Sequence, residues 1–330
     1  MNKLDTQNIK NFVKEVVRKD FPSLDEKHAY SFIEKAFITK LIHSTNKEDL
    51  DRWYKNIFIP NSFSLDSDDY SEAAIQSLRI VNNIAATDYG TSRQRDFGQK
   101  WADLIRGYLG ELGVKKVFKK KCNIDIDLGH DPGELEEYLP KDIHRVKTQS
   151  DVSLREPNLS VSIKAIKSNG MWLDIPGAQI NHSDIFIVSV LGIGTDHLFS
   201  FFKEMSVFTN KILPEGRRLK IIDHNEEQRV LETIPNFTEI IGYVPGFQLQ
   251  SIDSNFTYDG NMGRTNFTIT NWAGKPSKEN LEKVKEDTGA KKVNFEGIGV
   301  FSNPDEKYVY GIGELRSSDS DWQVCINNKI

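Results

Sequence analysis

Cysteine is scarce in this sequence, and long apolar runs are absent. The only two cysteines, Cys122 and Cys325, have no paired spacing, which excludes a zinc site built from four thiolates and permits at most one disulfide. The longest apolar run, residues 185–194, is far too short to span a membrane. The charged N-terminus lacks the apolar core of a signal peptide. We therefore expect a cytoplasmic protein with no membrane partner.

Several catalytic motifs are also missing. The seven histidines are scattered and form no group typical of histidine-dependent nucleases, and there is no GxxxxGK phosphate loop for nucleotide hydrolysis. The chain has 43 basic and 48 acidic residues and a net charge of −5, so its bulk charge does not indicate a nucleic-acid-binding protein. Its 38% hydrophobic and 28% charged residues are typical of a folded protein with a substantial core.

Hydrophobic periodicity divides the chain into three regions. Residues 1–90 form a predicted N-terminal helical region, with helices around 28–43 and 71–85. Residues 91–205 form a predicted core, and residues 206–330 a β-rich C-terminal region that we assign to DNA recognition or dimerisation. In the last region the pattern favours strands at 218–223, 239–249, 266–270, 292–301 and 307–313, and one helix at 277–289.

The core region begins with the strongest helical pattern in the sequence, over residues 92–121. Ser92 is a suitable N-cap, whereas Gly110 and Gly113 leave open whether the helix continues or breaks near its C-terminal part. Strands are predicted near 143–152, 159–166 and 184–191. The expected fold class is α/β, with a mixed central sheet flanked by helices.

Polar residues of this core are arranged in an order that suggests a site. Ser162 and Lys164 are two apart on the strand "LSVSIKAIK" (159–167), so they project from the same face. Asp151 ends the preceding predicted strand, and Glu111 borders the face of the long helix that packs on the sheet. Taken singly, each is more typical of a solvated side chain, so the prediction rests on their joint order.

This set suits the hydrolysis of a phosphodiester. Two carboxylates can hold Mg²⁺, which prefers oxygen ligands and retains bound waters. A lysine ammonium can orient the attacking water and stabilise the developing negative charge. The candidate catalytic residues are Asp151, Lys164, Glu111 and Ser162, with Asp151 and Glu111 as metal ligands.

The order of a helix with "GELG", a strand with Asp151, a strand with "SIK" and a further apolar strand resembles the PD-(D/E)xK nuclease superfamily. The resemblance is to type II restriction endonucleases in particular, and it covers residues 92–191. It implies a restriction-endonuclease-like core and Mg²⁺-dependent cleavage of double-stranded DNA at a specific sequence. It also implies a homodimer, because a two-fold protein matches a palindromic site.

The sequence departs from the family pattern at two positions. Ser150, not proline, precedes Asp151, and Ser162 stands where the family has an acidic residue two before the lysine. The carboxylate or amide groups that can compensate belong to Glu111, Glu156, Asp174 or Gln179. If none does, the chain is instead a non-catalytic DNA-binding or regulatory protein with a nuclease-like fold.

Basic residues on the long helix are candidates for contacts with DNA. They are Arg93 and Arg95 near its start, and Lys119 and Lys120 near its end. A solvated helix end is the commoner explanation for such lysines. A third hypothesis is a binding module centred on the β-rich C-terminal region that does not recognise nucleic acid.

Overall fold

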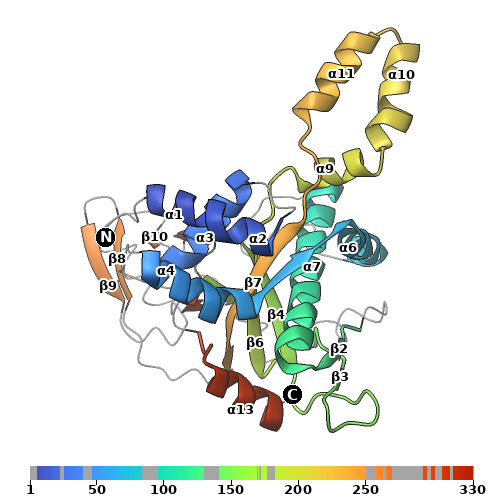
Figure 1. The fold of residues 1–330 in the computed structure, drawn as a ribbon. Coiled ribbons are helices and arrows are strands. Elements are labelled where there is room, and N and C mark those ends of the chain that lie inside the picture. Colours follow the sequence, from blue (N-terminus) through green and yellow to red (C-terminus); the bar gives the residue numbers. More distant parts are fainter. Residues whose placement is uncertain are drawn as a thin grey trace.

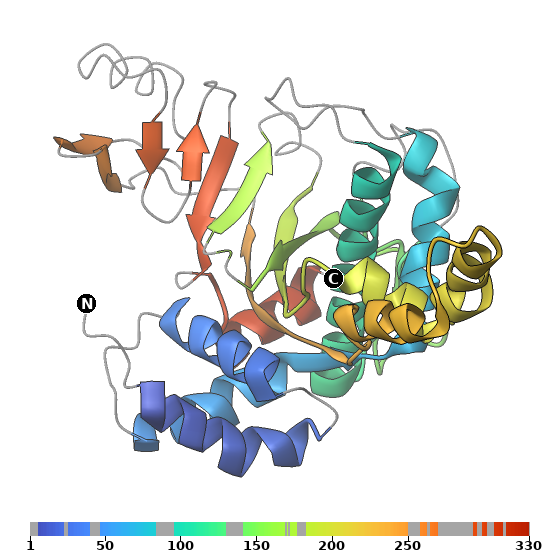
Figure 2. The same cartoon turned by 90° about the horizontal axis from the view of Figure 1, so that it is seen from above.

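The chain forms a mixed α/β fold around one four-stranded sheet with helices on both faces (Figures 1 and 2). The computed structural model describes residues 6–22, 26–39, 47–83, 96–129, 141–168, 170, 172–176, 183–249, 258–262, 265–269, 293–295, 299–301, 307–312 and 315–329. This architecture confirms the predicted mixed sheet with flanking helices. None of the described helices is long and apolar enough to cross a membrane.

The strands of the central sheet follow the order β1-β7-β6-β4, and β4 forms one edge. Strand β6 pairs in parallel with β4 and antiparallel with β7, which pairs antiparallel with β1. The predicted strands at 159–166, 184–191 and 239–249 are confirmed. The bounds of the four strands are Ser62–Leu65 (β1), Ile240–Leu249 (β7), Ile185–Leu191 (β6) and Val161–Lys167 (β4).

Strand β6 is apolar on both sides because both of its faces are covered. All of its residues are buried. Ile185 and Ile187 belong to the hydrophobic cluster on one face of the sheet, whereas Phe186 and Val188 belong to the cluster on the other. A continuous apolar run of this length is therefore the expected pattern for a strand between two layers.

One layer contains helix α7 (Phe97–Cys122) and helix α6 (Ser67–Ile80). The side chain of Asp96 caps α7 by accepting from the amide of Gln99 at 2.7 Å, so the predicted cap at Ser92 is wrong. The helix ends at Asn123, whose φ of 51° is in the left-handed region. Asn tolerates this conformation better than most residues.

Helix α7 continues through both of its doubtful glycines because they lie against the sheet. A Cβ on Gly110 would be 2.5 Å from the Cβ of Ala165 in β4, and a Cβ on Gly113 would be 2.2 Å from the ring of Phe63 in β1. These positions therefore require glycine for close approach rather than for a turn. The helix axis consequently lies directly on β4 and β1.

The other layer consists of the N-terminal helices, which pack on the opposite face of the sheet (Figure 2). Phe12, Phe32 and Phe58 from these helices are buried against Tyr243 of β7 and its neighbours. The described residues before Ser62 are helical, as predicted, but the predicted region 1–90 also contains strand β1 of the central sheet. The helices are α1 (Thr6–Phe12), α2 (Arg18–Asp20), α3 (Glu26–Thr39), α4 (Lys47–Trp53) and α5 (Ile59–Asn61), with π-helical segments at Val13–Val17 and Tyr54–Phe58.

The chain after β6 is helical where a strand is predicted. The predicted strand at 218–223 is wrong, because these residues join α10 (Leu213–Arg218) to α11 (His224–Thr233). The side chain of Asp223 caps α11 and accepts from the amide of Glu226, whose side chain accepts in return from the amide of Asp223. Local capping therefore outweighs the alternating pattern of "RLKIID". Helix α9 (His197–Glu204) precedes them.

The remaining strands form two-stranded ladders, and the chain ends in helix α13 (Asp319–Lys329). The predicted helix at 277–289 lies outside the described residues. The central sheet takes strands from all three predicted regions, whose boundaries stay a prediction. The ladders pair β2 (Asp125–Asp127) with β3 (Arg145–Lys147), β5 (Trp172–Pro176) with β12 (Lys307–Gly311), β8 (Tyr258–Met262) with β9 (Thr265–Ile269), and β10 (Val293–Phe295) with β11 (Gly299–Phe301).

Candidate active site at the edge of the sheet

The candidate site lies at β4, the edge strand of the central sheet among the described residues, where Asp142 is hydrogen-bonded to the strand. The backbone amide of Asp142 donates to the carbonyl oxygen of Val161 at 2.9 Å. Its carboxylate Oδ2 accepts from the hydroxyl of Ser162 at 3.1 Å and from the backbone amide of Ile163. Three contacts therefore fix Asp142 against the first three residues of β4.

Glu111 lies on helix α7, which packs on the face of β4 opposite to the one that Ile166 shares with Ser162 and Lys164. It directly follows Gly110, the residue at which the helix touches Ala165 of β4. Burial and the negative charge of Asp142 raise the pKa of Glu111 well above its ordinary value, while the ammonium of Lys164 acts in the opposite direction. The charges of Asp142 and Lys164 therefore both act on Glu111, in opposite directions.

Asp142 has the matching set of influences. Burial raises the pKa of Asp142, and this rise is opposed by the Lys164 ammonium, by the Ile163 amide and by the Ser162 hydroxyl. Burial therefore disfavours the ionised form of each carboxylate, and the Lys164 ammonium favours the ionised form of both. Perturbed carboxylates next to a lysine are typical of catalytic and metal-binding sites.

Lys164 and Ser162 project from the same face of β4, as the period of a strand requires. Ala165 packs toward α7, whereas the next residue, Ile166, packs toward the N-terminal helices. Lys164 is partly buried, and Ser162 is only 5% exposed. Ser162 is thus no solvated strand residue, because its hydroxyl holds the carboxylate of Asp142.

The structure places Asp151 in a different environment. Its carboxylate accepts from the amide and the hydroxyl of Thr148, at 2.8 and 2.7 Å, and from Nε of Arg155 at 3.2 Å. The hydrogen bond from the Thr148 amide is the main cause that lowers the pKa of Asp151. The predicted strand 143–152 stops at Lys147, so Asp151 stabilises the turn that follows β3. Its predicted role as a metal ligand stays a prediction.

Among the groups expected to compensate for Ser162 whose side chains the structure describes, Glu111 interacts electrostatically with Asp142 and Lys164. Glu156 is exposed and lies 3.9 Å from the ammonium of Lys141. Asp174 belongs to β5, and Gln179 lies outside the described residues. Sequence reasoning missed Asp142, although one signal was present: it follows Pro140 by two residues and directly precedes the segment of β3.

The predicted DNA-contacting lysines have partners within the protein. Lys119 lies 2.7 Å from the carboxylate of Asp125. Lys120 donates to the carbonyl oxygens of Ile59 and Ser62, and burial lowers its pKa. These contacts join the end of α7 to the segment around β1. Arg93 and Arg95 lie outside the described residues, and DNA binding by all four stays a prediction.

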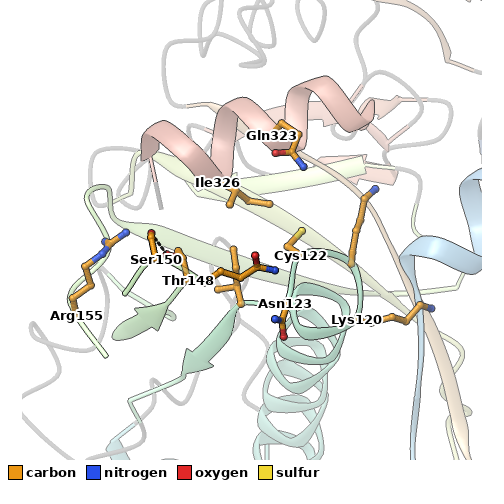
Figure 3. Close-up of a pocket in the computed structure, with 11 residues that line it drawn as sticks. Lys120, Cys122, Asn123, Thr148, Ser150, Arg155, Gln323 and Ile326 are labelled. Carbon is orange, nitrogen blue, oxygen red and sulfur yellow. Dashed lines mark hydrogen bonds between the residues drawn. The ribbon is translucent and has the colours of Figure 1, made fainter. Parts of the chain in front are cut away.

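A cleft of about 510 Å³ opens at the C-terminal end of α7, between that helix, the turn after β3 and helix α13 (Figure 3). Cys122, Thr148, Arg155 and Ile326 are among its lining residues. At 1.5 Å per helical residue, Cys122 lies roughly 16 Å along the axis from Glu111. The cleft is therefore separate from the edge of β4 at which the carboxylates meet.

The donors at the edge of β4 are few and are all oxygen. Within the described ranges, no group of three or more histidine, cysteine, aspartate or glutamate side chains is placed to hold a metal ion. Glu111 and Asp142 form a pair of carboxylates next to Lys164. Mg²⁺ is commonly bound by one or two carboxylates and keeps several waters, so the pair suits this ion.

Comparison with known proteins identifies no relative of this chain. No protein-family model matches the chain, and neither a curated protein nor a solved structure is detectably similar to it.

Proposed function

We propose that this protein is a Mg²⁺-dependent endonuclease of the PD-(D/E)xK type, which hydrolyses double-stranded DNA at a specific sequence. The observation that carries the proposal is that Asp142 is hydrogen-bonded to β4 beside Ser162 and Ile163, while the Lys164 ammonium acts on both Asp142 and the buried Glu111. In this proposal α7, β3, β4 and β6 correspond to the restriction-endonuclease-like core, and Asp142 takes the role that the sequence pattern gave to Asp151.

Glu111 and Asp142 would hold the metal ion. Both carboxylates are buried, and the charge of Asp142 further raises the pKa of Glu111, so ionising both groups beside the single Lys164 ammonium is unfavourable unless a further positive charge is bound. A divalent cation with oxygen preference fits this donor set. When bound, it would lower the pKa of a coordinated water and neutralise charge on the phosphate.

Side chains of the protein itself meet the other requirements of the hydrolysis. The Lys164 ammonium orients the attacking water and stabilises negative charge on the phosphate oxygens as the new P–O bond forms and the bond to the leaving oxygen breaks. Ser162 donates to Asp142 and fixes its carboxylate. Glu111 provides the second carboxylate, which the family pattern has at the position of Ser162.

The proposal is tested by incubating a mixture of plasmids with the protein and Mg²⁺. We expect discrete fragments, and we expect Asp142→Asn and Lys164→Met to lower the cleavage rate at least 100-fold, because such groups contribute several kcal/mol and about 1.4 kcal/mol is a factor of ten. Asp125→Asn, an exposed carboxylate in β2, is the control that retains cleavage.

Two results would change the assignment. Loss of cleavage in Asp151→Asn but not in Asp142→Asn would restore the sequence-based site and refute the one at the edge of β4. Salt-sensitive DNA binding without any cleavage would favour the non-catalytic DNA-binding protein, for which the serine at position 162 is the specific argument. A protein that neither binds nor cleaves DNA at low salt would favour the third hypothesis, a binding module.

A further inference from the structure

The cleft at the C-terminal end of α7 (Figure 3) has no part in the proposed hydrolysis, and its size suits a small molecule. Its volume of about 510 Å³ lies within the range of small-molecule sites, roughly 300–1,000 Å³. Surfaces that recognise duplex DNA are instead extended, with roughly 1,000–2,500 Å² of buried protein surface. A concave space of this volume therefore matches one small ligand better than a length of duplex.

Among the described residues, the charged side chains that line the cleft are all basic. They belong to Lys120, Lys121 and Arg155, and Figure 3 shows Lys120 and Arg155 at its opposite ends. Two carboxylates offset part of this charge: Asp319, which is 89% exposed, lies 3.0 Å from Nζ of Lys121, and Asp151 lies 3.2 Å from Nε of Arg155. Lys120 donates to two backbone carbonyl oxygens, which carry no net charge. Three cations against two carboxylates leave the cleft suited to an anion.

Three amide side chains also line the cleft, those of Asn123, Gln149 and Gln323. An amide presents a donor next to an acceptor, which is the pattern that bonds to two neighbouring atoms on the edge of a nucleobase. In Figure 3 Gln323 points from α13 toward the end of α7. A bare phosphate needs no such groups, so we expect a ligand that also carries a polar ring.

Other lining side chains suit the rest of such a ligand. Thr148 and Ser150 carry hydroxyls on the turn after β3, and hydroxyls can bond to those of a sugar. Ile124 and Ile326 are apolar parts of the lining, against which the face of a flat ring can pack. One cleft therefore combines cations for a phosphate, hydroxyls for a sugar, and amides and apolar side chains for a base.

We propose that this cleft binds a nucleotide, with its phosphate at the basic side chains and its base at the amides. Cys122 in the lining lies roughly 16 Å along α7 from Glu111. The nucleotide would therefore be a separate ligand and not the DNA that is cleaved. Nucleotide binding here does not depend on the nuclease proposal, since it involves none of the residues at the edge of β4.

The test is isothermal titration calorimetry of the whole chain with each of the four nucleoside 5′-monophosphates of RNA, in EDTA so that no metal ion takes part. We expect at least one of them to bind at one site per chain, at least about tenfold more tightly than inorganic phosphate or the matching nucleoside. Phosphate lacks the groups that the amides recognise, and the nucleoside lacks the charge. Equal affinity for inorganic phosphate, or no binding of any of the four, would overturn the proposal.

Variants at exposed positions locate the bound nucleotide without disturbing the core. Gln149→Trp fills the cleft and should weaken binding at least about tenfold. Its matched control is Gln228→Trp on α11, which is also exposed and should bind as the wild type does. Arg155→Gln should weaken the binding of the nucleotide more than that of the nucleoside, whereas Arg229→Gln, at an exposed position on α11, should change neither. Wild-type affinity in Gln149→Trp, with unchanged circular dichroism, would refute the site.

A short DNA duplex distinguishes a free nucleotide from a nucleotide within a nucleic acid. We expect the duplex to leave the bound nucleotide in place, because the cleft accepts one small ligand. Displacement of the nucleotide by the duplex, together with loss of duplex binding in Gln149→Trp, would overturn the proposal and would identify the cleft as part of a DNA-binding surface.

Discussion

Gly110 is the residue at which helix α7 meets the edge strand, and a methyl group there should disturb both stability and the candidate site. A Cβ at this position would be 2.5 Å from the Cβ and 3.3 Å from the Cα of Ala165. Neither atom can move without moving the backbone of β4. Gly107, one turn earlier on α7, has no atom within 4 Å of the corresponding Cβ position. The two glycines thus form a matched pair in one helix.

The expected magnitudes follow from two opposing effects. Alanine is favoured over glycine inside a helix by about 1 kcal/mol, so Gly107→Ala should raise the free energy of unfolding by up to that amount. Gly110→Ala gains the same propensity but overpacks a rigid contact, which typically costs about 1–3 kcal/mol. We therefore expect Gly110→Ala to lower the free energy of unfolding by up to about 2 kcal/mol.

Unfolding in guanidinium chloride, followed by circular dichroism, measures the difference between the two variants. Their midpoints should lie on opposite sides of the wild-type midpoint. If Gly110→Ala is as stable as Gly107→Ala, α7 does not lie on β4 as closely as the structure indicates. A second readout rests on the proposed function: a shift of about 1 Å at Glu111 should reduce cleavage roughly 100-fold.

Three other predictions follow from single side chains. Burial lowers the pKa of His197 to about 4, so between pH 6.5 and pH 4 the unfolded chain binds a proton at this residue and the folded chain does not. The free energy of unfolding should therefore fall by on the order of 3 kcal/mol as the pH is lowered through this range. His197→Gln should flatten this pH dependence of the unfolding midpoint, and an unchanged slope would contradict the prediction. Asp66→Ala should lower the free energy of unfolding by about 1 kcal/mol at neutral pH, because it removes the capping box of α6. The effect should shrink in acid, since a backbone amide lowers the pKa of Asp66 and its contribution is lost as the pH falls through that value. A thiol reagent at neutral pH should label the native protein slowly, because burial raises the pKa of Cys122 and Cys325 is buried, and rapid labelling of both would refute this packing.

The sequence was sufficient to predict those helices and strands whose hydrophobic pattern follows directly from their burial. Strand β6 is covered on both faces, and all of its residues except Ser189 are apolar, which is the pattern expected of a buried strand. The same reasoning failed at 218–223, where alternating residues belong to the exposed connection between α10 and α11. Alternation predicts a strand only if one face is buried, and the sequence does not reveal that this segment is exposed.

The prediction of Asp151 as a site residue depended on where one strand ends. Strand β3 stops at Lys147, because Thr148 and Asp151 then close a turn through side-chain hydrogen bonds. Such turn chemistry is visible in the sequence as a run of small polar residues. Asp142 is harder to find, because its position depends on a contact with β4 across a long loop, and no local pattern encodes that contact.

The serine at position 162 illustrates how a helix can provide what a strand lacks. Glycine at position 110 lets the backbone of α7 approach that of β4, and the next residue in the helix is Glu111. A larger residue at 110 would hold the helix away and would separate this carboxylate from Asp142 and Lys164. The "GELG" segment therefore contains both the glycine that permits close packing, Gly110, and the carboxylate, Glu111. In the proposed nuclease, the loss of the strand acid is compensated by this approach, and a Ser162→Glu variant should crowd the buried Asp142 rather than improve the site.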